Sequence, residues 1–73
     1  MEMIGLKEIR KKKRLSQLKV GLDIAISREA ISYYENGKRC PSIETLVSLS
    51  KYFNVSIDYL ITGKDFEKSN SRK

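Results

Sequence analysis

The 73-residue chain has no histidine and no tryptophan, and Cys40 is its single cysteine. One cysteine cannot form a disulfide within the chain, and the usual His and Cys spacings of metal sites are missing, so we expect no metal and no other cofactor. Ser-His-Asp and Cys-His catalytic arrangements are missing as well, which predicts that the protein is not an enzyme. No apolar run is long enough for a signal peptide core or a membrane span, so we expect a cytoplasmic protein without a membrane partner.

Positive charge is in excess. The formal net charge is +6, and residues 1–14 contribute +4 of it through six cations and two carboxylates. Such an excess predicts a polyanionic partner or an acidic surface. A run of cations is also the ordinary composition of a solvated helix face, so this run alone leaves both interpretations open.

Apolar residues recur at helical spacing throughout the chain, and no stretch alternates as a strand would. We therefore predict an all-α fold of five helices. Residues 1–63 form one domain, followed by a polar, disordered tail over 64–73. A core this small leaves only a few kcal/mol of net stability, which makes association with a second chain reasonable.

Four of the five helices have recognisable ends or inward faces. We expect the first from Ile4 to Arg14, and a second after a cap at Ser16. Their inward residues are Leu6, Ile9, Val20 and Ile24. A fourth follows Pro41 with Ser42 as its cap, and its helically spaced stripe is predicted to be core: Ile43, Leu46, Val47, Ser50 and Phe53. Asn54 ends that helix, and a last one begins after Ser56 and runs to Leu60 or Ile61 before Gly63.

The segment 15–42 is organised as two short helices, a tight turn and a basic loop. Ser27 suits an N-cap, and Ile31 and Tyr34 fall on one side that faces a core. Gly37 ends the helix because it takes a positive φ without steric cost. The outward residues are Arg28, Glu29, Ser32 and Tyr33, and the loop continues with Lys38 and Arg39. One apolar face and one polar face followed by cations is the layout of a helix-turn-helix that binds DNA.

Several motifs recur at consistent spacing between residues 4 and 62. They are Leu15-Ser16-Gln17, Ile26-Ser27-Arg28, Ile31-Ser32, Glu35-Asn36-Gly37, Pro41-Ser42 and Asn54-Val55-Ser56-Ile57-Asp58-Tyr59-Leu60. Together they resemble the Cro and cI-type (XRE) phage repressor family of helix-turn-helix domains. The resemblance implies a compact five-helix domain like that of lambda repressor, in which helices two and three form the helix-turn-helix. It also implies double-stranded DNA as partner, a homodimer on a two-fold symmetric operator, and a place at the nucleoid of a prokaryotic host.

The resemblance assigns roles to individual positions. It places Arg28, Glu29 and Tyr33 at base edges and Ser32 at a base or a phosphate. It assigns phosphate contacts to Gln17, Ser27, Asn36, Lys38 and Arg39. Arg28 suits a guanine edge and Glu29 a cytosine amino group, although the two side chains also suit a pair with each other. Gln17 is equally an ordinary polar residue in the first turn of its helix.

Arg10 and Glu35 match a pair that ties the first helix to the end of the recognition helix in this family; two separate surface residues remain the simpler alternative. The last helix and the turn before it offer more apolar area than one short helix buries. The predicted dimer surface therefore comprises Val55, Ile57, Tyr59 and Ile61. Without a second domain in this chain, we expect a dimer that is weak in solution and completed on DNA.

Three features depart from the family pattern or remain ambiguous. Ala25 stands where a glycine is usual, so either the turn avoids positive φ or it is strained. Leu18 and Leu22 replace polar residues on one face of the second helix, as a partner surface or as an extension of the core, and we favour the core. Gly21 marks a close helix crossing or is merely tolerated.

The favoured function is a sequence-specific transcriptional regulator, most simply a repressor that occludes a promoter. The alternative is an interaction module such as the antitoxin of a toxin pair, with Leu18, Leu22 and the residues after Lys64 as the place where the toxin docks. An antirepressor is a further conceivable partner. General RNA binding is weaker, because the aromatic residues mostly fit core positions rather than exposed stacking positions.

Overall fold

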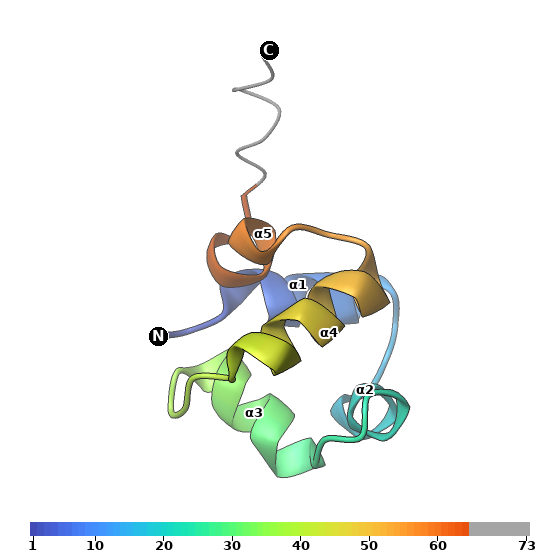
Figure 1. Cartoon of the computed structure of the whole chain (residues 1–73). Coiled ribbons are helices and arrows are strands. Elements are labelled where there is room, and N and C mark those ends of the chain that lie inside the picture. Colours follow the sequence, from blue (N-terminus) through green and yellow to red (C-terminus); the bar gives the residue numbers. More distant parts are fainter. Residues whose placement is uncertain (65–73) are drawn as a thin grey trace.

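The computed structural model describes residues 1–64, which form five helices and contain no strand. The helices are α1 (Ile4–Lys12), α2 (Gln17–Asp23), α3 (Arg28–Asn36), α4 (Ile43–Phe53) and α5 (Ile57–Thr62). Figure 1 shows α5 at one end of the domain and α2 with α3 at the other, with α1 and α4 between them. The predicted all-α fold of five helices is confirmed. The tail expected over 64–73 lies outside the described residues except for Lys64.

Serine side chains cap four of the helices. In each case the Oγ accepts a hydrogen bond from the backbone N–H three residues further on, an interaction that contributes about 1 kcal/mol. These caps are the predicted ones: Ser16, Ser27, Ser42 and Ser56. Three predicted helix stops are also confirmed by their left-handed backbone conformations: Gly37, Asn54 and Gly63. The last helix runs to Thr62, slightly beyond its predicted end at Leu60 or Ile61.

All five helices contribute residues to the core. Its buried apolar residues are Met3, Leu6, Ile9, Val20, Ile31, Tyr34, Leu49, Phe53 and Leu60. α1 crosses α5 so closely that a Cβ at Gly5 would lie 1.6 Å from the Tyr59 carbonyl oxygen. A Cβ at Gly21 would similarly lie 2.4 Å from the backbone oxygen of Ile26. Gly21 is therefore not merely tolerated, although the backbone it approaches is the turn before α3 rather than a crossing helix.

The first helix is shorter than the sequence suggests. It ends at Lys12 rather than at Arg14, because the chain must turn toward α2. Arg14 takes a left-handed conformation with φ 60°, and the N–H of Leu15 donates to the carbonyl of Arg10 over 3.0 Å. This arrangement satisfies a terminal carbonyl of α1 without glycine.

The inward face of α4 differs from the predicted stripe. Ile43 is 78% exposed and Val47 is 38% exposed, whereas Leu49, which the stripe omitted, is fully buried. Phe53 is buried as expected. Ile43 begins the helix at the edge of the domain, where none of the described helices covers it. The true face is therefore rotated toward Leu49, and the prediction for Ile43 and Val47 was wrong.

Leu18 and Leu22 are not part of the core. Their exposed fractions are 53% and 70%, which overturns the preference for burial. α2 packs mainly against α3 through Val20 and Gly21, so its opposite face has no neighbour within the described residues. The half-buried Ile24 packs against the core, in line with its predicted side.

The turn between α2 and α3 is strained. Ala25 adopts φ 62°, a left-handed conformation in which a Cβ crowds the following carbonyl. The turn therefore has the geometry that glycine would suit, and alanine occupies it at a cost of about 1 kcal/mol.

Candidate nucleic-acid interface

A buried polar network fixes the inner side of α3. Arg10 Nε donates to Glu35 Oε2 over 2.6 Å, and Arg10 Nη2 donates to Glu35 Oε1 over 3.1 Å. The same Oε1 accepts from Gln17 Nε2 over 3.1 Å, and Arg10 Nη1 donates to the Leu15 carbonyl over 2.8 Å. The side chains of Arg10 and Glu35 are only 11% and 1% exposed. The two residues predicted to pair thus lie in contact, and with Gln17 they join α1, α2 and α3.

The outer side of the first turn of α3 is open to solvent. Arg28 Nη2 and Glu29 Oε2 are 3.9 Å apart, too far for a hydrogen bond, and their side chains are 54% and 64% exposed. Ser27 Oγ caps the helix by accepting from the N–H of Ala30 over 3.0 Å. A pair this exposed is weakly bound, so both side chains are available to an incoming ligand.

The last turn of α3 is more engaged. Asn36 Nδ2 donates to the Ser32 carbonyl over 3.0 Å and to Ser32 Oγ over 3.3 Å. The guanidinium carbon of Arg39 lies 5.5 Å from the centre of the Tyr33 ring. Sequence reasoning missed this cation–π contact. A signal for it exists, since an aromatic residue near a helix end is followed by a glycine that turns the chain back and then by an arginine.

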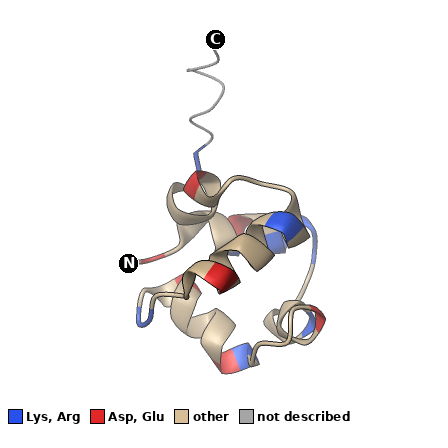
Figure 2. Ribbon diagram, viewed as in Figure 1, with Lys and Arg blue, Asp and Glu red and all other residues tan. Residues whose placement is uncertain are grey.

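The loop after α3 presents cations beside this helix. Lys38 and Arg39 are exposed. Figure 2 shows blue in the turn between α3 and α4, and blue and red together at the start of α3. The N–H of Gly37 donates to the Tyr34 carbonyl and the N–H of Lys38 donates to the Tyr33 carbonyl. These two main-chain donors are therefore used to end α3, and the loop offers its side chains to a ligand.

A second contact, which the sequence did not reveal, connects α2 to α4. The hydroxyl of Tyr52 donates to Asp23 Oδ2 over 2.5 Å, and Lys19 Nζ lies 3.3 Å from Asp23 Oδ1. The hydrogen bond from Tyr52 lowers the pKa of Asp23, and the same bond raises the pKa of Tyr52. The sequence had predicted only that most of the aromatic residues fit core positions.

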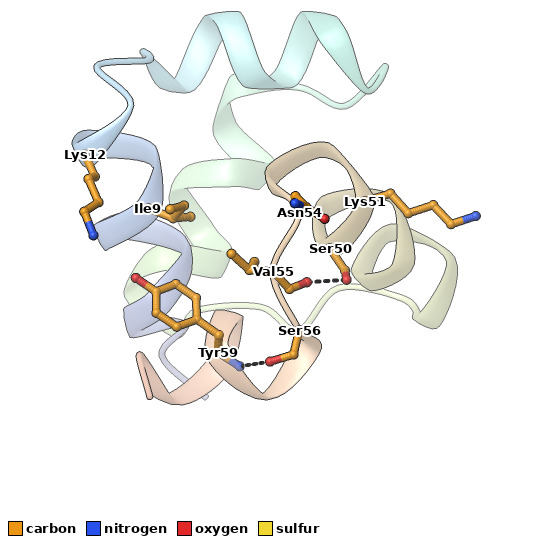
Figure 3. A pocket seen from close by; sticks show the side chains of 8 residues that line it. All are labelled: Ile9, Lys12, Ser50, Lys51, Asn54, Val55, Ser56 and Tyr59. Carbon is orange, nitrogen blue, oxygen red and sulfur yellow. Dashed lines mark hydrogen bonds between the residues drawn. The ribbon is translucent and has the colours of Figure 1, made fainter. Parts of the chain in front are cut away.

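The predicted dimer residues lie at the other end of the domain and are half-buried: Val55, Ile57, Tyr59 and Ile61. Val55 and Tyr59 line an open groove of about 560 Å³ between α1, α4 and α5. Figure 3 shows Lys12 and Lys51 on opposite sides of this groove, directed away from each other. Burial raises the pKa of Tyr59, and the nearby Glu8 carboxylate acts in the same direction.

Among residues 1–64 there is no group of His, Cys, Asp and Glu side chains that could hold a metal ion. Within the same part of the chain, every helix is too short or too polar to cross a bilayer.

Comparisons with known proteins give a consistent result. A family model described as Helix-turn-helix matches residues 6–60. The uncharacterized HTH-type transcriptional regulator YqaE of Bacillus subtilis is 41% identical over 64 residues, which are 88% of this chain and 55% of YqaE. The HTH-type transcriptional activator BcrR of Enterococcus faecalis is 40% identical over 60 residues, which are 82% of this chain and 29% of BcrR. The chain thus spans about half the length of one relative and less than a third of the other.

A solved structure has the same fold. The crystal structure of the c2 repressor of Salmonella phage P22 in complex with a synthetic operator matches with a TM-score of 0.76 and 33% identity, covering 88% of this chain and 100% of that chain.

Proposed function

Because the chain belongs to the Cro and cI-type family of helix-turn-helix regulators, we propose that it is a sequence-specific transcriptional regulator. More specifically, we propose a cytoplasmic, non-enzymatic repressor that occupies a two-fold symmetric operator through the major groove. One observation carries this proposal: the first turn of α3 is exposed, while the buried network of Arg10, Glu35 and Gln17 fixes the last turn of the same helix to α1 and α2. A helix that reads DNA must be fixed to its own domain on one side and free to contact the DNA on the other.

In this proposal the first turn of α3 contacts base edges. The Arg28 guanidinium can donate two hydrogen bonds to guanine O6 and N7, and the Glu29 carboxylate can accept from a cytosine amino group. Their mutual contact is exposed and 3.9 Å long, so little is lost when it opens. Glu29 is unfavourable beside phosphates unless it meets a donor. It therefore contributes discrimination between bases rather than affinity.

The phosphate contacts come from the edges of the helix-turn-helix. Lys38 and Arg39 are exposed at the end of α3, and Ser27 lies at its start. Gln17 keeps one amide proton and its carbonyl oxygen beyond the bond to Glu35. The Asn36 amide nitrogen donates to both the Ser32 carbonyl and the Ser32 hydroxyl. Because the remaining carbonyl oxygen cannot donate to a phosphate, the phosphate role of Asn36 is the weakest of this set. Such contacts set the register on DNA.

We also propose a homodimer through Val55, Ile57, Tyr59 and Ile61. A two-fold dimer places its two recognition helices about 34 Å apart, one turn of the duplex. These residues are half-buried, which leaves part of their apolar surface for a second copy of the chain. We expect a weak dimer that DNA completes. Sedimentation at micromolar concentration tests this expectation, and a tight dimer without DNA would contradict it.

The proposed function is tested by selecting bound sequences from a random duplex library at about 150 mM salt, which suppresses purely electrostatic binding. We expect an enriched inverted repeat with half-sites about one helical turn apart. Binding without enrichment would remove the claim of sequence specificity. A promoter reporter carrying the enriched site then separates repression from activation, because only a repressor lowers its output.

The exposure of Leu18 and Leu22 favours a second candidate, an antitoxin-like module that binds a protein partner through α2. A partner encoded by a neighbouring gene should then co-purify with the chain and be lost from the Leu18→Ser/Leu22→Ser variant, while DNA binding is retained. Purification of the wild-type chain alone from its own host would argue against this candidate.

A further inference from the structure

The contact between Tyr33 and Arg39 joins the recognition helix to the loop that follows it. Gly37, with φ 77°, turns the chain back, and the N–H of Lys38 donates to the Tyr33 carbonyl over 2.9 Å. These two features bring the Arg39 guanidinium to 5.5 Å from the centre of the Tyr33 ring. The backbone geometry thus sets the position of the contact, and the two side chains complete it.

We propose that Tyr33 acts on DNA through Arg39, as a positioning residue that orients the guanidinium toward a phosphate, and that base discrimination is confined to Arg28 and Glu29. This inference rests on the proposed function and refines it, because the family resemblance places Tyr33 itself at a base edge. A phosphate clamp made by Arg39 binds any sequence. The specificity of the protein then depends on the first turn of α3 alone.

The chemistry of arginine supports this division of roles. A guanidinium can lie against an aromatic ring with its face and still direct its N–H groups, which lie in its plane, at a phosphate. The ring restricts a long side chain, so less conformational entropy is lost when the phosphate is bound. Meanwhile Tyr33 is 39% exposed, so the ring is open to solvent on part of its surface. One face of the ring carries the Arg39 cation, which gives the ring a role other than a base contact.

The test is a double-mutant cycle on duplex binding. The variants are Tyr33→Ala, Arg39→Ala and the combination of both, with Tyr33→Phe as the conservative substitution and Lys51→Ala as a charge-matched control at the far end of α4. Dissociation constants are measured against salt on the selected site, on sites with each base pair changed, and on a duplex without the site. Thermal melts verify that every variant is folded.

We expect Tyr33→Ala to weaken binding to all these duplexes by a similar factor, about two- to fivefold. Its salt slope should fall toward that of Arg39→Ala, which loses about 0.9 from losing one phosphate contact. Tyr33→Phe should rescue most of the loss, because the ring is retained. In the Arg39→Ala background, removal of the tyrosine ring should have no further effect. Lys51→Ala should leave the slope unchanged.

Two results would overturn the inference: a change of preference at one base pair in Tyr33→Ala or Tyr33→Phe with an unaltered salt slope, or losses from Tyr33→Ala and Arg39→Ala that simply add. These outcomes are separable from failure of the proposed function. If selection enriches no sequence, the cycle is still measured on the duplex without the site, where a phosphate clamp must act. If the wild-type chain binds no duplex, both proposals fail.

Discussion

Glu35 on the inner side of α3 and Glu29 on its outer side have the same carboxylate chemistry in opposite settings. The Glu35 side chain is 1% exposed and accepts three hydrogen bonds, two from Arg10 and one from Gln17. The Glu29 side chain is 64% exposed, and its nearest cation, Arg28, is 3.9 Å away. A buried charge is tolerated only when its partners are complete. An exposed carboxylate whose partner cation lies beyond hydrogen-bond distance is free to bind a ligand.

The difference indicates a division between stability and recognition within one helix. The inner network orients α3 relative to α1 and α2, so changes there should unfold the domain or misplace the helix. The outer residues contribute little to the fold, so changes there should alter DNA binding without altering stability. Each substitution below tests one side of this comparison.

The largest effect is expected from Arg10→Met on the inner side. It leaves Glu35 buried beside Gln17 alone, and loss of one partner of a buried ion pair costs about 3–5 kcal/mol. For a domain of this size the melting temperature should fall by at least about 10 °C. Thermal unfolding followed by circular dichroism measures the change.

The matched control is Lys11→Met, which removes the same charge from an exposed position on the same helix. Its melting temperature should remain within a few degrees of the wild type, since surface substitutions usually change stability by less than about 0.5 kcal/mol. Equal melting temperatures for the two variants would show that the pair between Arg10 and Glu35 does not stabilise the domain. The inner side of α3 would then not be the side that provides stability.

An intermediate effect is expected from Glu29→Ala on the outer side, and it concerns selectivity. Loss of a carboxylate that accepts from a cytosine should relax preference at one base pair by about 1–3 kcal/mol, with the melting temperature unchanged. Lys38→Ala is the contrasting variant, which should weaken all sequences alike and reduce the salt slope by about one. Identical behaviour of these two variants would refute the separation of base contacts from phosphate contacts.

Local features of the domain could be predicted from the sequence because each has a short-range cause. Ser27 accepts from the first turn whatever packs around it, and Gly37 takes a positive φ because it lacks a Cβ. Long-range packing could not be predicted in the same way. Helical spacing shows that Leu18 and Leu22 share a face, but not whether another element covers it, and in this domain none of the described helices does.

The contacts of the candidate site also differ in whether the sequence could predict them. The contact between Arg10 and Glu35 was expected through a family resemblance and not from the residues themselves, since many residues separate them in the chain. The bond from Tyr52 to Asp23 depends on where the ends of two helices meet, which no periodic pattern encodes, so it became visible only with the fold. The contact of Arg39 with Tyr33 is local, and its signal is an aromatic residue followed by a glycine turn and an arginine.

The smallest effect is expected in the turn that leads into α3, and it has the opposite sign. Ala25 adopts φ 62°, and glycine relieves this strain while losing more entropy on folding, so Ala25→Gly should stabilise the domain by less than about 1 kcal/mol. Ala30→Gly is the control, because a regular helical position should instead lose about 1 kcal/mol. Denaturant unfolding of both variants measures the sign of each change in stability, and destabilisation by Ala25→Gly would mean that the turn is not strained.

The same variant also tests what orients α3. If the stability of Ala25→Gly rises while its base preference stays the same, the inner network alone orients the outer side of α3. If selectivity falls, the rigid alanine turn also holds that orientation, and the division between the two sides is less complete than the two glutamates indicate.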